Sequence, residues 1–137
     1  MATATVITDL KNQIMLGTHH FGTDVYKLCF FAAANAPSAG NSTYATLPAT
    51  KVATTNINDP VVSLSESAGN VTCSPTALTA TGAFGPFRYY VLYNFTNANQ
   101  YTVAIYDHGS EVSLISGESF TIRWASSAGA GSIIALT

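Results

Sequence analysis

Charged residues are scarce in this sequence. Lys, Arg, Asp and Glu make up only 9% of its 137 residues, whereas an ordinary soluble domain has roughly 25%. The net charge is −2, and the basic residues are scattered along the chain at Lys11, Lys27, Lys51, Arg88 and Arg123. Nucleic-acid binding needs a positive patch that neutralises phosphates. This distribution therefore excludes a nucleic-acid-binding protein.

Thr, Ala, Ser, Asn and Gly take the place of the missing charges, interleaved with Val, Ile, Tyr and Phe. Such a surface is polar but carries few of the charges that keep protein surfaces apart. The composition favours a protein that packs against neighbouring molecules over an enzyme that works with charged side chains.

Long apolar runs and a targeting segment are also missing. No stretch reaches the ~18–20 consecutive apolar residues of a membrane span, and the N-terminus lacks the basic region and apolar run of a signal peptide. We therefore expect no membrane contact, and synthesis and folding in a cytosol. The two cysteines, Cys29 and Cys73, are then expected to be reduced, small apolar residues.

Apolar residues recur at helical spacing near the N-terminus, where Val6, Leu10 and Ile14 lie four apart and Gly17 is a plausible stop. This spacing predicts a helix over about residues 5–16. Everything after it favours β-structure. Residues 25–31 are rich in strand formers and largely apolar on both faces, which is typical of a central strand.

Turn residues separate the remaining apolar runs and predict three hairpins. The paired runs are residues 61–65 with 71–74, 88–95 with 101–106, and 111–115 with 119–124, followed by a closing strand at 133–136. Short strands at this spacing predict one mainly β domain over residues 1–137. We expect an antiparallel β-sandwich or jelly-roll-like barrel, with the one short N-terminal helix at an end or edge.

Alternation along residues 88–95 divides the aromatic side chains between two faces of a strand. We assign Tyr89, Val91, Tyr93 and Phe95 to the core, which makes Tyr90 and Leu92 candidate interface residues. Loops at residues 32–48, 77–87 and 126–132 are expected to carry contact specificity. These loops add three aromatic interface candidates, namely Tyr44, Phe84 and Phe87.

No catalytic or metal-binding constellation stands out. His19 and His20 lie near Asp24, but neighbouring side chains of an extended segment point to opposite faces, and a stable metal site needs three or four converging ligands. Asp107 and His108, followed by a glycine, are typical of a turn between two strands. The sequence has no Gly-x-Ser-x-Gly motif that would supply the serine of a catalytic triad. We therefore expect a protein without catalytic residues, cofactor, metal or small-molecule substrate.

Several stretches carry a resemblance to known proteins. They are Leu16-Gly17-Thr18-His19-His20-Phe21 leading into Asp24-Val25-Tyr26-Lys27-Leu28, then Arg88-Tyr89-Tyr90-Val91-Leu92-Tyr93-Asn94, Tyr106-Asp107-His108-Gly109-Ser110, and Gly117-Glu118-Ser119-Phe120-Thr121-Ile122-Arg123-Trp124. With the helix before them and the closing Leu136-Thr137, they resemble a family of small virion structural proteins of tailed bacteriophages. The resemblance is weak between about residues 32 and 82, and His108 stands where the family usually has an aromatic residue.

The resemblance implies a virion structural protein. We expect a capsid decoration or cement protein that stabilises the coat lattice by burying surface across several subunits. Its partners would be the major capsid protein and copies of itself, in a possible trimer, on the capsid surface of a virion assembled in the host cytoplasm. The alternative is a tail or fibre component, with a glycan- or receptor-binding role for exposed aromatic residues.

Overall fold

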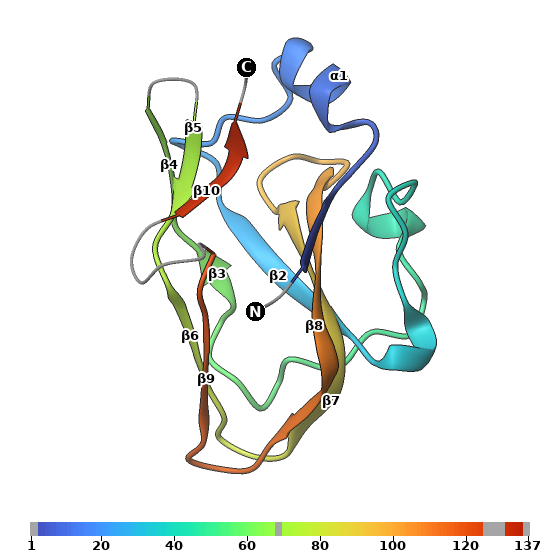
Figure 1. Cartoon of the computed structure of the whole chain (residues 1–137), viewed down its shortest axis with the longest axis vertical. Helices are drawn as coiled ribbons and strands as arrows, with labels where there is room; N and C mark the ends of the chain where they lie inside the picture. The colour runs from blue at the N-terminus through green and yellow to red at the C-terminus, as the bar shows by residue number, and fades with distance from the viewer. Residues whose placement is uncertain (1–2, 68–69, 125–130, 136–137) are drawn as a thin grey trace.

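The computed structural model describes residues 3–67, 70–124 and 131–135, and strands are the main element (Figure 1). The strands are β1 (Thr3–Val6), β2 (Tyr26–Phe31), β3 (Val61–Val62), β4 (Leu64–Ser67), β5 (Asn70–Cys73), β6 (Thr76–Thr79), β7 (Phe84–Asn94), β8 (Thr102–Leu114), β9 (Ser119–Ile122) and β10 (Gly131–Ala135). The helical segments are α1 (Leu10–Met15) and two single 3₁₀ turns, η1 (Ala33–Asn35) and η2 (Tyr44–Thr46). The predicted class, mainly β with one short N-terminal helix, is confirmed.

The main sheet has the strand order β1-β8-β7-β2-β3, and its neighbouring strands run antiparallel. β7 and β8 form a long hairpin in which Tyr90 lies opposite Tyr106 and Leu92 opposite Ala104. This confirms the hairpin predicted around residues 88–106. β2 pairs along the other edge of β7, as expected of a central strand with apolar residues on both faces.

A second layer lies beside the main sheet. β4 and β5 form a hairpin with β10 against β5, and β6 pairs with β9. These strands lie on one side of β2, β7 and β8 (Figure 1). The β4–β5 pair confirms the hairpin predicted across residues 61–74, with its strands shifted by a few residues. The arrangement is sandwich-like and not a closed barrel.

The hairpin predicted for residues 111–115 and 119–124 is wrong. β8 runs on to Leu114, which lies opposite Phe84 of β7, while Phe120 of β9 lies opposite Leu78 of β6. Gly117, at φ +90°, sits in the turn that carries the chain out of the main sheet and into the second layer. Local turn signals showed that a turn occurs there but could not show that its two strands pair with different partners.

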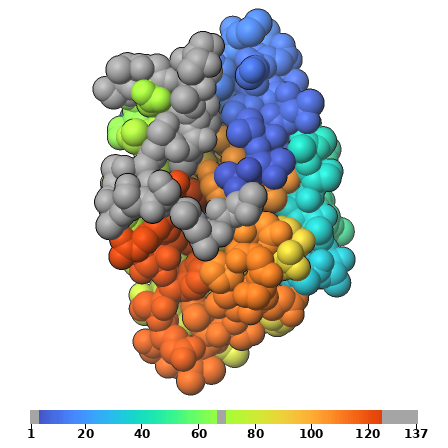
Figure 2. Space-filling model, viewed as in Figure 1, coloured from blue at the N-terminus to red at the C-terminus, as the bar shows by residue number. Residues whose placement is uncertain are grey.

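The N-terminal segment combines a strand and a helix where one longer helix was predicted. Thr3–Val6 pairs with β8 as β1, and α1 begins only at Leu10. Thr and Val favour strands because their β-branched side chains restrict χ1 in a helix. Gly17, at φ +70°, ends the helix as predicted. Among the described residues, no helix is long and apolar enough to cross a membrane. Figure 2 shows the N-terminal segment in blue against the orange surface of β8.

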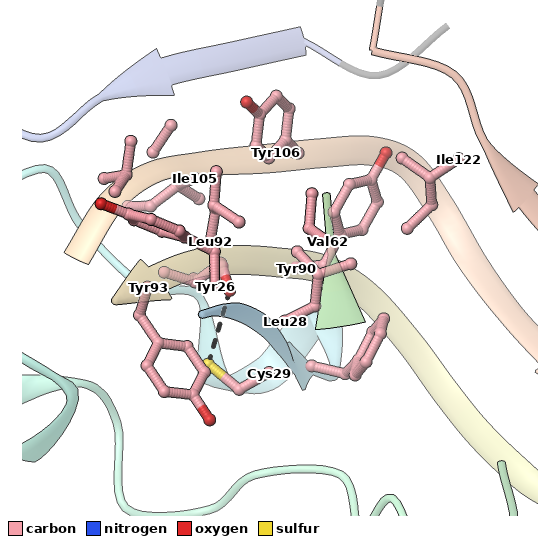
Figure 3. Close-up of a cluster of buried hydrophobic side chains, with 14 of the residues drawn as sticks. Tyr26, Leu28, Cys29, Val62, Tyr90, Leu92, Tyr93, Ile105, Tyr106 and Ile122 are labelled. Carbon is pink, nitrogen blue, oxygen red and sulfur yellow. Dashed lines mark hydrogen bonds between the residues drawn. The ribbon is translucent and has the colours of Figure 1, made fainter. Parts of the chain in front are cut away.

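Both faces of the main sheet are covered. On one face, the rings of Tyr90 and Tyr106 stack with centroids 5.4 Å apart, and Trp124 meets Tyr106 edge-on at 4.8 Å. On the other face, the segment that connects β2 to β3 covers Cys29 and Tyr93 (Figure 3). That segment runs along the outer side of the sheet (Figure 1). The core therefore has two layers of side chains, one on each side of β2 and β7.

This double coverage corrects the interface candidates. Tyr90, Leu92, Phe84 and Phe87 are all at most 3% exposed, so they are core residues and not contact residues. Phe30 of β2 touches three of them, with ring centroids 5.2 Å from Phe84 and Phe87 and 6.4 Å from Tyr90. A period of two separates two faces but cannot say which face water reaches, and here water reaches neither.

Only two of the four residues assigned to the core of this strand are fully buried. Val91 and Tyr93 are buried as predicted, Tyr89 is half-buried, and Phe95 is exposed because it lies beyond the end of β7. The two cysteines are free and buried. Burial raises the pKa of each thiol to about 12, which keeps both in the unreactive protonated form.

Candidate functional site

Most carboxylates are engaged inside the fold. Six of the seven acidic side chains accept a hydrogen bond from another group of the protein: Asp9 from Gln13, Asp24 from Asn94, Asp59 from Lys27, Asp107 from Arg88, Glu111 from the Ala33 backbone and Glu118 from the Ile115 backbone. A carboxylate held in this way fixes loops and strand ends. It is poorly placed to exchange protons with a substrate.

The two histidines next to each other in sequence lie in different surroundings. His19 is buried and stacks on Phe21 with ring centroids 5.4 Å apart, whereas His20 is exposed. His20 Nδ1 lies 3.5 Å from the carboxylate of Asp24. Within the described ranges, no group of three or more His, Cys, Asp or Glu side chains is placed to hold a metal ion.

A buried polar network surrounds His19. Its Nδ1 lies 3.3 Å from the Tyr26 hydroxyl and 3.5 Å from Asn94 Nδ2, and Asn94 also donates to Asp24 at 2.7 Å. Burial would raise the pKa of Asp24, but the hydrogen bonds from Asn94 and from the His20 backbone lower it. Burial lowers the pKa of His19 from 6.5 to about 4, against the opposing effect of Asp24. The network thus keeps a neutral imidazole beside an ionised carboxylate.

This imidazole makes the fold acid-sensitive. In the unfolded chain His19 takes up a proton near pH 6.5, but in the folded chain only near pH 4. The stability that neutral His19 contributes is therefore fully present above pH 6.5 and is lost as the pH falls from 6.5 toward 4. We expect the free energy of unfolding to drop by roughly 2 kcal/mol between pH 7 and about pH 4.5 from this group. Urea denaturation at the two pH values measures the drop.

The variant that tests this assignment is His19→Phe, which keeps a ring against Phe21 and removes the titrating group. Most of the drop should disappear in this variant. The matched control is His20→Gln, which changes the exposed neighbour and should retain the drop. An unchanged drop in His19→Phe would show that another group causes the acid sensitivity.

Asp107 and His108 do not form part of a catalytic triad. Asp107 accepts two hydrogen bonds from Arg88, at 2.8 and 3.0 Å, and one from the Gly109 backbone. The hydrogen bond from Arg88 lowers the pKa of Asp107 despite its partial burial. The His108 ring instead packs edge-on against Phe120 at 5.3 Å. The carboxylate therefore orients the arginine and the turn, and not the imidazole.

Tyr44, the remaining interface candidate, lies at a pocket. The pocket has a volume of about 290 Å³ and opens between β2, β7 and the segment that connects β2 to β3. We call it the Tyr44–Tyr93 pocket. It is lined by Lys27, Leu28, Cys29, Tyr44, Lys51, Val52, Ala53, Thr54, Asp59, Pro60, Tyr93 and Phe95.

Backbone hydrogen bonds hold the pocket walls to β2. The Val52 amide donates to the Phe30 carbonyl at 2.8 Å, and the Leu28 amide donates to the Pro60 carbonyl at 3.0 Å. Residues 51–54 and 59–60 therefore stand beside the strand although they belong to a connection with little sequence pattern. The ring of Tyr44 packs on the ring of Tyr93 with centroids 4.8 Å apart.

Two lysines and one carboxylate lie in this pocket. Lys27 Nζ is 3.0 Å from Asp59 Oδ2 and 4.1 Å from the centroid of the Phe95 ring. Lys51 Nζ is 4.5 Å from the centroid of the Tyr44 ring and donates to the Pro48 carbonyl at 3.1 Å. Such ammonium–ring contacts stabilise the cations where water is partly excluded.

The tyrosines of the pocket are neutral hydrogen-bond donors. Burial raises the pKa of Tyr44, and burial raises that of Tyr93 still further, with a smaller effect from the nearby Cys29. Both hydroxyls therefore keep their protons at neutral pH and can donate to an acceptor.

A shallower pocket of about 350 Å³ lies just beyond the N-terminal end of β2, around the turn after α1. Its lining includes Thr18, His20, Asp24 and Asn97. Its carboxylate, Asp24, already accepts hydrogen bonds from Asn94 and from the His20 backbone. This hollow therefore offers fewer free polar groups than the Tyr44–Tyr93 pocket.

Comparison of the chain with known protein families, with curated proteins and with solved structures gave no match. The structure therefore stands as the main guide to the site. Sequence reasoning found Tyr44 but missed Lys27, Lys51, Asp59 and Tyr93 as its neighbours. The one available signal was Lys27, a charged residue within the apolar run that forms β2.

Proposed function

We propose that this chain is a non-enzymatic structural protein of a tailed-phage virion, and specifically a decoration or cement protein on the capsid surface. The observation that carries the proposal is the engagement of six of its seven carboxylates within the fold. Few charges then remain to be stripped of water when the surface is buried against a neighbour. A broad contact with the coat lattice is correspondingly less costly.

The exposed apolar residues suggest where such a contact forms. Met15 and Leu16, at the end of α1, are 83% and 69% exposed. Val6, on the edge strand β1, is exposed as well. Apolar side chains of this kind gain most when another protein covers them. These residues replace Tyr90, Leu92, Phe84 and Phe87 as the proposed contacts with the major capsid protein or with further copies of this chain.

A cement role follows from where surface is buried. A subunit that contacts two or more coat proteins loses part of that contact when the lattice opens, so its binding stabilises the closed shell. A trimer would suit the three-fold positions of a capsid lattice. Neither step requires a cofactor, a substrate or a nucleic acid.

Copy number in purified virions tests the proposal. Quantitative mass spectrometry against the major capsid protein should give a ratio within a few-fold of one to one. A handful of copies per particle would favour the tail or fibre alternative, in which exposed aromatic residues meet a receptor. Absence of the protein from virions would overturn both versions of the proposal.

A further inference from the structure

We propose that the Tyr44–Tyr93 pocket is a binding site for a single carboxylated sugar ring, such as a hexuronic acid. This inference concerns the isolated chain and does not depend on where the protein sits in a virion. It rests on the size of the pocket, on the balance of its charges and on a tyrosine hydroxyl at the pocket that makes no hydrogen bond within the described part of the protein.

The size of the pocket limits the ligand to one ring. Its volume of about 290 Å³ lies at the lower end of the roughly 300–1,000 Å³ typical of small-molecule sites. A nucleotide, with its base, sugar and phosphates, would not fit. One six-membered sugar ring, with its substituents, is of the right size.

The charges of the pocket favour an anion. Lys27 is neutralised by Asp59 at 3.0 Å. Across the described ranges, by contrast, no carboxylate lies within ion-pair distance of Lys51. Lys51 contacts the Pro48 carbonyl and the ring faces of Tyr44 and Phe31. The pocket therefore holds one uncompensated positive charge, which a ligand carboxylate would match.

A tyrosine hydroxyl at the pocket can bind a polar ligand. Tyr93 is 7% exposed as a whole residue, and within the described ranges its hydroxyl makes no hydrogen bond to the protein. The hydroxyl is not enclosed by protein, and its side chain lines the pocket. A ligand hydroxyl or carboxylate in the pocket would complete its hydrogen bonding.

The remaining groups suit a sugar in particular. The Asp59 side chain is 60% exposed, so its carboxylate can accept hydrogen bonds from ligand hydroxyls while it stays paired with Lys27. The Phe95 ring lies at the pocket and is exposed. Lys27 lies over one face of this ring, and the other face can pack against the C–H bonds of a sugar ring. The pocket thus brings together a hydrogen-bond acceptor, hydrogen-bond donors, a cation and an aromatic ring.

An NMR titration of the full-length protein with sodium glucuronate tests the site, with glucose and sodium acetate as parallel titrants. We expect saturable amide shifts at residues 27–29, 51–54 and 93–95, with a dissociation constant in the millimolar range, on the order of 1–10 mM. Glucose, which lacks the carboxylate, and acetate, which lacks the ring, should each bind about tenfold or more weakly. Equal binding of glucuronate and either control would overturn the proposal.

Three variants locate the interactions. Lys51→Gln should weaken glucuronate binding about tenfold and leave glucose binding unchanged. Tyr93→Phe should weaken the binding of both sugars. Phe95→Ala changes an exposed ring, so it keeps the fold and should also weaken both. The matched control is Lys11→Gln, which removes a charge on α1 outside the pocket.

Thermal denaturation first establishes that each variant folds. No saturable shift with any titrant would overturn the proposal, as would a Lys11→Gln effect equal to that of Lys51→Gln. Glucuronate shifts that centre on the hollow around Thr18 and Asn97 would do the same. Loss of binding in Phe95→Ala and Lys51→Gln, with the control unchanged, is the expected result.

Discussion

Replacing Phe30 with alanine is expected to destabilise the protein by about 4 kcal/mol, within the 3–5 kcal/mol range for buried aromatic truncations. The side chain is completely buried near the C-terminal end of β2. Its ring touches Phe84 and Phe87 edge-on, both at 5.2 Å. Alanine would leave a cavity lined by aromatic rings, and large rigid rings collapse poorly into such a space. Urea denaturation monitored by the fluorescence of Trp124 measures the loss.

The conservative variant Phe30→Leu separates the effect of volume from that of removing the side chain. It should cost less than half as much, since leucine fills much of the same space. A loss below about 1.5 kcal/mol for Phe30→Ala would contradict the packing of Phe30 against the aromatic rings of β7, because such values are typical of conservative core swaps.

Replacing Gly85 with alanine is expected to cost about 3 kcal/mol, the sum of a backbone and a steric effect. Gly85 has a φ of +112°, which side-chain-bearing residues rarely adopt. A Cβ at this position would lie 2.6 Å from the Val112 carbonyl oxygen of the paired strand. Because that atom belongs to the backbone of β8, it cannot move aside without breaking the strand pairing. The melting temperature should fall by about 10 °C.

Two other glycines provide matched controls. Gly109 and Gly117 have φ values of +92° and +90°, but a Cβ at either would meet nothing within 4 Å. Alanine there should cost only the backbone effect, about 1 kcal/mol. An equal loss at all three positions would show that the approach of β8 to Gly85 is wider than the structure shows.

Local patterns in the sequence predicted the elements better than their partners. The apolar run at residues 25–31 and the turn at residues 96–100 identified β2 and the β7–β8 hairpin, because both signals are short-range. The turn at Gly117 was also found. Its strands were paired wrongly, since pairing of β9 with β6 is decided by contacts about 40 residues apart in the chain.

The buried faces of β7 could not be assigned from its alternation. One face is covered by the second layer and the other by the connection between β2 and β3, whose sequence has little periodicity. A loop-like composition gave no sign that this connection would act as a cover. The interface assignment of Tyr90 and Leu92 was therefore wrong, although their placement on one face was sound.

The pocket was beyond sequence reasoning for the same reason. Its polar groups come from three separate stretches, with Lys27 on β2, Lys51 and Asp59 on the connection and Tyr93 on β7. In the sequence, each of these residues is indistinguishable from an ordinary surface or core residue. The backbone hydrogen bonds of Val52 and Pro60 to β2 bring them together.

The pairing of β2 with β7 has a consequence for synthesis on the ribosome. Strand Tyr26–Phe31 is made first, while its partner is complete only when Asn94 has been added. At roughly 5–20 residues per second, this interval lasts several seconds. During it, one of the most apolar stretches of the chain lacks its longest partner strand, and its low charge offers little protection against pairing with the same stretch of a neighbouring nascent chain. Chaperones, or wide spacing between ribosomes, would keep β2 from pairing with a neighbouring chain until β7 is complete.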